Sequence, residues 1–160
     1  MKTPEEVQQV AEKMCGKTLV TKQSGEEGLS CNCVYIVEKI EIEKELYLSL
    51  ALDRKEGKPV FIYSQAGGMS IEEVAHSNPD KIHKLYVESS KTLDVDALLE
   101  AAKHLGLEQQ KSELVFLFNH LISCFKERDC DLIEINPLVV TKDGQLIAAD
   151  SKITIDENAT

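Results

Sequence analysis

The sequence predicts an α+β domain with a mainly antiparallel sheet and packed helices. Residues 46–63 and 131–153 each contain two apolar runs separated by turn residues, which is typical of β-hairpins. Residues 94–104 and 109–128 carry apolar side chains at helical spacing instead. Hairpins combined with consecutive helices favour an α+β arrangement over alternating parallel units.

The N-terminal part of the chain is expected to begin with one amphipathic helix between Thr3 and Gly16. Threonine is a favoured N-cap, and the proline that follows it suits the first helical position. Short strands are predicted at residues 18–22 and 32–40, where β-branched and aromatic side chains gather. The charged run at residues 41–45 is expected to interrupt the sheet before the next strand.

The middle of the chain predicts a short helix followed by a strand and a linker. Ser70 and Glu73 have capping-box spacing, and the two glycines just before them permit a tight turn into the helix. Pro79 marks the end of this helix. Residues 81–87 have the composition of a strand, and residues 89–94 are polar enough to form a surface linker.

The turn in the last hairpin determines which residues face each other. We expect residues 142–144 to form a three-residue loop with the glycine in the left-handed conformation, so that Thr141 faces Gln145. A two-residue loop would shift the register by one residue and bring other side chains together.

The expected register places oxygen-bearing side chains on one face of the hairpin. Counting back from the turn sets Asn136 opposite Asp150, and Glu134 opposite Lys152 on the same face. Oxygen ligands of this kind suit Mg²⁺, which takes few protein ligands and completes its shell with phosphate oxygens and water. Spacing alone favours a simpler alternative, in which Asp150 and Lys152 are solvated and Glu134 pairs with Lys152.

Composition excludes several classes of function. A formal net charge of −10 and a pI near 4.9 argue against a nucleic-acid surface, which needs clustered Lys and Arg. No apolar run approaches the roughly 20 residues that span a bilayer, and no signal or transit pattern precedes the first helix. The five cysteines lack the spacing of a disulfide framework, so we expect free thiols and a reducing compartment.

Several stretches of the sequence resemble a known family. Residues 134–144, followed by residues 148–152, closely resemble the end of the ATP-grasp domain in the β subunit of succinate–CoA ligase, also called succinyl-CoA synthetase. Residues 19–23, 44–48 and 67–75 are similar to other parts of that subunit. The resemblance covers essentially the whole chain.

The resemblance implies a function and a partner. In this family an ATP-grasp fold grips ATP/ADP or GTP/GDP with Mg²⁺, and a phosphohistidine of the α subunit carries the phosphoryl group. The enzyme is an acid–thiol ligase of the tricarboxylic acid cycle, which interconverts succinyl-CoA, nucleoside diphosphate and phosphate with succinate, CoA and nucleoside triphosphate. It works in the mitochondrial matrix or the cytoplasm as a heterodimer or heterotetramer.

The resemblance also implies roles for individual residues. Asn136 and Asp150 would hold Mg²⁺, and Glu134 would act at the catalytic centre by helping to receive the phosphohistidine loop of the partner. The nucleotide base and ribose would run along Glu38, Ile40 and Glu45, with Glu38 and Glu45 as side-chain contacts. Composition alone would instead make these acids a solvated connection between strands.

The sequence departs from the family by omission. It lacks the upstream Lys and the Gly-Arg-Gly phosphate loop, and also the CoA-ligase domain that follows in the family. We therefore expect residues 1–160 to form a partial ATP-grasp domain with little or no activity alone, because phosphate positioning supplies most of the catalysis. The alternatives are a piece of a malate–CoA ligase or an ATP-citrate lyase, and a non-catalytic interaction module.

Overall fold

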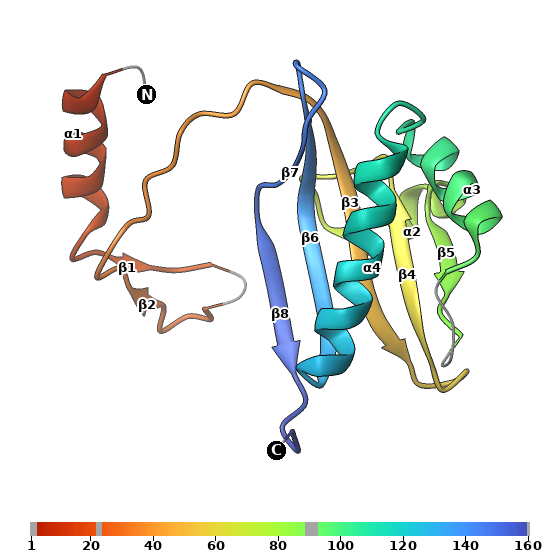
Figure 1. Cartoon of the computed structure of the whole chain (residues 1–160). Coiled ribbons are helices and arrows are strands. Elements are labelled where there is room, and N and C mark those ends of the chain that lie inside the picture. The colour runs from red at the N-terminus through yellow and green to blue at the C-terminus, as the bar shows by residue number, and fades with distance from the viewer. Residues whose placement is uncertain (1–2, 22–23, 89–92, 160) are drawn as a thin grey trace. The chain divides into compact units, whose positions relative to one another are not determined.

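The computed structural model describes residues 3–21, 24–88 and 93–159, and it is drawn in Figure 1. The chain divides into two compact units, Met1–Lys39 and Ile40–Thr160.

The first unit contains one helix and a small two-stranded sheet. Helix α1 (Pro4–Met14) begins where expected, and Oγ1 of Thr3 accepts a 3.3 Å hydrogen bond from the backbone N–H of Glu6. Strands β1 (Thr18–Leu19) and β2 (Leu29–Ser30) pair antiparallel. The predicted helix is therefore confirmed. The predicted strand at residues 18–22 is confirmed only over its first two residues, and Lys22 lies outside the described residues.

The predicted strand at residues 32–40 is wrong. These residues form no regular structure, and the side chain of Tyr35 is 93% exposed. Aromatic and β-branched residues favour strands mainly because they pack on a half-buried pleated surface. Among the described residues no neighbouring strand pairs with this segment, so its apolar composition does not produce a strand.

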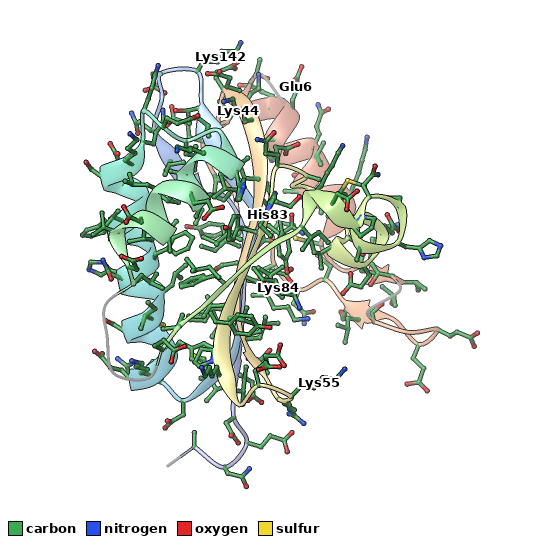
Figure 2. The ribbon with its side chains drawn as sticks, turned by 90° about the vertical axis from the view of Figure 1, so that its right-hand side faces the viewer. Glu6, Lys44, Lys55, His83, Lys84 and Lys142 are labelled. Carbon is green, nitrogen blue, oxygen red and sulfur yellow. The ribbon has the colours of Figure 1, made fainter. Side chains whose placement is uncertain are left out.

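The second unit is built on one antiparallel sheet with the strand order β5-β4-β3-β6-β7, in which β8 also pairs with β6. Figure 2 shows Lys44 and Lys55 near opposite ends of this sheet, close to the two ends of β3. The predicted antiparallel sheet is confirmed. Its strands are β3 (Ile42–Asp53), β4 (Lys58–Ser64), β5 (His83–Tyr86), β6 (Cys130–Thr141), β7 (Leu146–Ala148) and β8 (Ser151–Ile155).

The start of β3 corrects another expectation. The charged residues 41–45 do not interrupt the sheet, because β3 already begins at Ile42. Ile42 pairs with Thr141 and Glu45 pairs with Val139 on β6. The long neighbouring strand supplies partners for the backbone of this segment, and this overrides the low strand preference of glutamate and lysine.

Helices cover both faces of the sheet. Helices α3 (Val95–Leu105) and α4 (Lys111–Glu127) lie on one face, while the short α2 (Ile71–Ser77) lies on the other, as Figures 1 and 2 show. A 3-10 turn, Pro79–Lys81, leads from α2 into β5. The expected linker at residues 89–94 lies mostly outside the described residues.

The hydrophobic core lies between the sheet and the pair of helices α3 and α4. Phe118 of α4 is fully buried, and its ring centroid is 4.2 Å from that of Phe61 on β4. The predicted apolar side of α4 is confirmed, since it packs against this core. Its buried members are Leu114, Phe118 and Phe125, and its partly buried members are Leu117, Leu121 and Ile122.

Strand β6 changes the side it presents to the core halfway along its length. Leu48 pairs with Ile135 and Leu46 pairs with Leu138, so Asn136 and Pro137 together stand opposite the single residue Tyr47. This is the arrangement of a β-bulge, which inserts one extra residue and reverses the alternation beyond it. The Asn136–Pro137 peptide bond within it is cis. The bulge therefore lies at one of the residues of interest for function.

Within the described ranges, no helix combines the length and apolar character needed to cross a membrane. The five cysteines are all free thiols, as expected.

Candidate functional site

The turn of the last hairpin has the predicted form. The N–H of Gly144 donates to the carbonyl of Thr141 at 2.9 Å, and the N–H of Thr141 donates to the carbonyl of Gln145 at 3.0 Å. Gly144 has φ +85°, a left-handed conformation that glycine adopts without steric cost. The three-residue loop is thus confirmed.

The register that follows from this turn is also confirmed. The backbone N–H of Asn136 donates to the carbonyl of Asp150 at 3.3 Å, and Glu134 pairs directly with Lys152. In an antiparallel pair, residues that face each other project to the same side of the sheet. Asn136 and Asp150, the predicted metal ligands, therefore belong to one patch with Glu134 and Lys152.

Tyr47 is a further member of this patch that sequence reasoning missed. Its hydroxyl donates a 3.1 Å hydrogen bond to Oε2 of Glu134, and the residue is only 3% exposed. Burial, reinforced by the negative charge of Glu134, raises the pKa of Tyr47 to about 12. Its hydroxyl therefore stays protonated and remains a donor throughout the physiological range. The alternation of Tyr47 with the core residues of β3 is the sequence signal that could have placed it on this face.

The loop of Gly67, Gly68 and Met69 before α2, called the glycine loop from here on, contacts the predicted site at Asn136. Oδ1 of Asn136 accepts a 2.8 Å hydrogen bond from the N–H of Gly68, and Nδ2 of Asn136 donates to the carbonyl of Met69 at 3.0 Å. These contacts join residues that are more than 60 positions apart in the chain. The sequence predicted a tight turn at these glycines but gave no indication that it would contact the hairpin.

Of the residues predicted to bind the nucleotide, Glu38 belongs to the first unit, and Ile40 and Glu45 belong to the second. Glu45 lies on β3, and a Cβ added to Gly68 would come within 3.2 Å of its Oε2. The loop therefore brings Glu45 close to Asn136. Ile40 begins the second unit and is partly buried, whereas Glu38 is exposed and belongs to the first unit. A role for Glu38 and Ile40 stays a prediction.

The acidic start of α2 adds charge near this patch. Oγ of Ser70 donates a 2.5 Å hydrogen bond to Oε2 of Glu72. This bond is the main reason that the pKa of Glu72 is lowered. The positive charge of Lys152 contributes in the same direction, and the charge of Glu72 also acts on Tyr47. A cation and several carboxylates thus share this face of the sheet.

The chemistry of Asn136 and Asp150 fits Mg²⁺. An amide oxygen has two lone pairs, so Oδ1 of Asn136 can bind an ion while it accepts the bond from Gly68. Asp150 is exposed, and its Oδ1 accepts a hydrogen bond from the N–H of Ser151 at 2.9 Å. The described residues hold no group of three or more His, Cys, Asp or Glu side chains suited to a metal. Two oxygen ligands are nonetheless the usual protein contribution to a Mg²⁺–phosphate complex.

The fold and sequence together define the class of protein. The model of the ATP-grasp domain family matches residues 1–140, and the chain therefore belongs to the ATP-grasp family. It is similar to succinate–CoA ligase [ADP-forming] subunit beta from Trichlorobacter lovleyi, with 46% identity over 98% of this chain and 41% of the relative. The subunit of the same name from Chloroherpeton thalassium is 42% identical over 99% of this chain.

The chain is much shorter than these relatives. The chain spans about two fifths of each, 41% in both cases. Among solved structures, ATP citrate lyase from Methanothrix soehngenii in complex with citrate and coenzyme A superimposes with a TM-score of 0.56. That match has 17% identity and covers 95% of this chain and 33% of the other. It supports the predicted ATP-grasp fold.

Proposed function

We propose that this chain is the nucleotide- and Mg²⁺-binding part of a succinate–CoA ligase β subunit. The observation that carries the proposal is the cross-strand pairing of Asn136 with Asp150 beside Glu134. The identity to β subunits of that name supports the same conclusion. The similarity to ATP citrate lyase concerns the fold alone.

In the proposed mechanism, Asn136 and Asp150 would hold Mg²⁺, and the ion would supply positive charge beside the nucleotide phosphates. The family resemblance also makes Glu38, Ile40 and Glu45 candidates for contacts with the nucleotide, and the carboxylate of Glu45 lies beside Gly68. Glu134, held by the hydroxyl of Tyr47, receives the loop of the α subunit that carries the phosphohistidine. Lys152 opposite Glu134 supplies the positive charge that an approaching phosphoryl group requires.

The reaction itself is proposed for a whole protein of this kind. Succinyl-CoA, phosphate and nucleoside diphosphate would give succinate, CoA and nucleoside triphosphate through the phosphohistidine, as a step of the tricarboxylic acid cycle. The partner is the α subunit, and the compartment is reducing, in the mitochondrial matrix or the cytoplasm. We expect the 160 residues alone to bind nucleotide with little or no turnover.

Calorimetric titration with ADP and with GDP, each with and without Mg²⁺, tests the proposal. Binding that needs Mg²⁺ and is lost in Asp150→Ala would support it, and the stronger ligand would reveal the preferred base. Asp96→Ala is the matched control, because it also removes an exposed carboxylate, but from α3 on the other face of the sheet. Equal binding by Asp150→Ala and Asp96→Ala would refute the assignment of the metal ligand.

A further inference from the structure

We propose that the loop of Gly67, Gly68 and Met69 positions Asn136 for metal binding and ties the metal site to Glu45. This inference rests on the proposed function and extends it to three residues that carry no functional side chain there. The hydrogen bonds of the glycine loop to Glu45 and Asn136 are made through its backbone, so the side-chain chemistry of the loop does not reveal them.

The glycine loop determines the orientation of the Asn136 amide. Gly68 offers a donor to Oδ1 at 2.8 Å, and Met69 offers an acceptor to Nδ2 at 3.0 Å. If the amide were rotated by half a turn, it would set donor against donor and acceptor against acceptor. The glycine loop therefore selects one of the two orientations. It fixes the position of the carbonyl oxygen and leaves that oxygen one lone pair for an ion.

The glycine loop is itself held in place by β3. The N–H of Gly67 donates to the carbonyl of Glu45 at 3.1 Å, which anchors the loop on β3. A Cβ at position 67 would lie 2.4 Å from the carbonyl oxygen of Leu46, so only glycine allows this close approach. Gly68 has φ +72°, a conformation that residues with side chains rarely adopt.

The glycine loop connects the proposed metal ligand Asn136 with Glu45. The glycine loop bonds to Asn136 through Gly68 and Met69, and it bonds to the backbone of Glu45 through Gly67. The carboxylate of Glu45 lies beside Gly68, within 3.4 Å of the place that a Cβ would take. A residue proposed to bind the nucleotide and one proposed to bind its metal are thus held by the same short backbone segment.

The test uses Mn²⁺ alone as the probe, because its binding can be followed by water-proton relaxation and does not depend on turnover. Gly67→Ala should push the loop away from β3 without changing Asn136 or Asp150. Loss of a group that orients a metal ligand typically weakens metal binding by roughly 10–100-fold. We expect a weakening of this size, together with faster hydrogen exchange at the amide of Gly68.

Gly68→Ala is the second variant, and Gly57→Ala is its matched control. Gly57 has φ +64° and open space around it in the β3–β4 turn, so an alanine there causes similar backbone strain away from the site. Gly68→Ala should weaken Mn²⁺ binding and Gly57→Ala should not, although both lose stability. This control separates an effect on the site from a general loss of folding.

The outcomes separate this inference from the function on which it rests. If the wild type binds Mn²⁺ and the Gly67 and Gly68 variants bind it equally well, the positioning role is overturned and the metal site stands. If the wild type binds no Mn²⁺, the metal part of the proposed function fails, and the inference fails with it. If hydrogen exchange at the Gly68 amide is unprotected in the wild type, the bond from Gly68 to Asn136 does not hold the Asn136 amide, and the positioning role is overturned.

Discussion

The hydroxyl of Tyr47 donates a 3.1 Å hydrogen bond to Oε2 of Glu134 and so connects β3 to β6 beside the bulge. Both residues face away from the main core, on the side of the sheet that carries Asn136. The bond gives Glu134 a fixed neutral donor, whereas Lys152 provides the nearby positive charge. Glu134 is thus bonded to a neutral donor on β3 and paired in register with a lysine on β8.

Tyr47→Phe removes this hydrogen bond and keeps the ring. Because Tyr47 is buried and its partner is a carboxylate, we expect the free energy of unfolding to fall by about 1.5–3 kcal/mol. Urea unfolding followed by circular dichroism measures the change. Tyr86→Phe is the matched control, since Tyr86 donates a 3.0 Å bond to Asp53 at an exposed position and its loss should cost much less. Equal losses would show that burial does not strengthen the Tyr47 bond.

The stacked rings of His83 and His104 predict a dependence of stability on pH. The ring centroids are 3.9 Å apart, and burial, followed by the nearby His104, lowers the pKa of His83 below its usual 6.5. The folded state then binds fewer protons than the unfolded state, so the free energy of unfolding falls as the pH drops below about 6.5. The neighbouring charged groups are Glu100 of α3, which opposes this shift, and Asp80 and Lys81, which line the same hollow.

His83→Phe keeps an aromatic ring in the stack and removes the titrating group. We expect the variant to lose less stability than the wild type when the pH is lowered from about 7.5 to about 5.5. Urea unfolding at both pH values gives the comparison. The explanation fails if the wild type and His83→Phe lose the same free energy over this interval.

The turn glycine of the last hairpin predicts a simple conformational cost. Gly144→Ala forces a residue with a side chain into φ +85°, which should cost about 1–2 kcal/mol. The nearest atom to an added Cβ is Nε2 of Gln110 at 3.5 Å, an ordinary contact, so steric overlap adds little. Gly144→Asn should cost less, because asparagine tolerates this conformation better. Thermal unfolding measures both, and equal losses would mean that backbone conformation is not the cause.

Two phenylalanines of α4 give a matched test of the core. Phe118 is fully buried against Phe61, whereas Phe116 is 64% exposed and packs on His120. Phe118→Ala should lower the free energy of unfolding by about 3–5 kcal/mol, because it removes buried surface and leaves a cavity. Phe116→Ala should have a small effect. A comparable loss of stability from Phe116→Ala would show that burial in the core does not explain the effect of Phe118→Ala.

The sequence predicted those features that depend on local rules. The register of Asn136 with Asp150 follows from the period of two along a strand and from the glycine of the turn. The buried side of α4 follows from helical spacing in the same way. Both can be worked out from neighbouring residues, and the structure confirms both.

Other features depend on contacts between distant parts of the chain and could not be predicted in this way. The hydrogen bonds of Asn136 to the glycine loop join β6 to the start of α2, and nothing near either segment indicates them. Residues 32–40 have a strand-like composition but pair with no strand in the part of the chain that the structure describes, whereas residues 42–45 have a poor composition and pair with β6. In each case the neighbour decides the structure. The roles of Glu38, Ile40 and Glu45 came from resemblance to a family and stay predictions.

Strand β6 contributes to the core and to the candidate site at once. Ile133 and Ile135 are buried beneath α4, while Glu134 and Asn136 alternate with them on the other face. Few substitutions in this strand can change one face without disturbing the other through the bulge. Mutational scanning should therefore find β6 nearly intolerant along its length. Exposed residues of the β2–β3 connection, such as Tyr35 at 93% exposure, should tolerate substitution better.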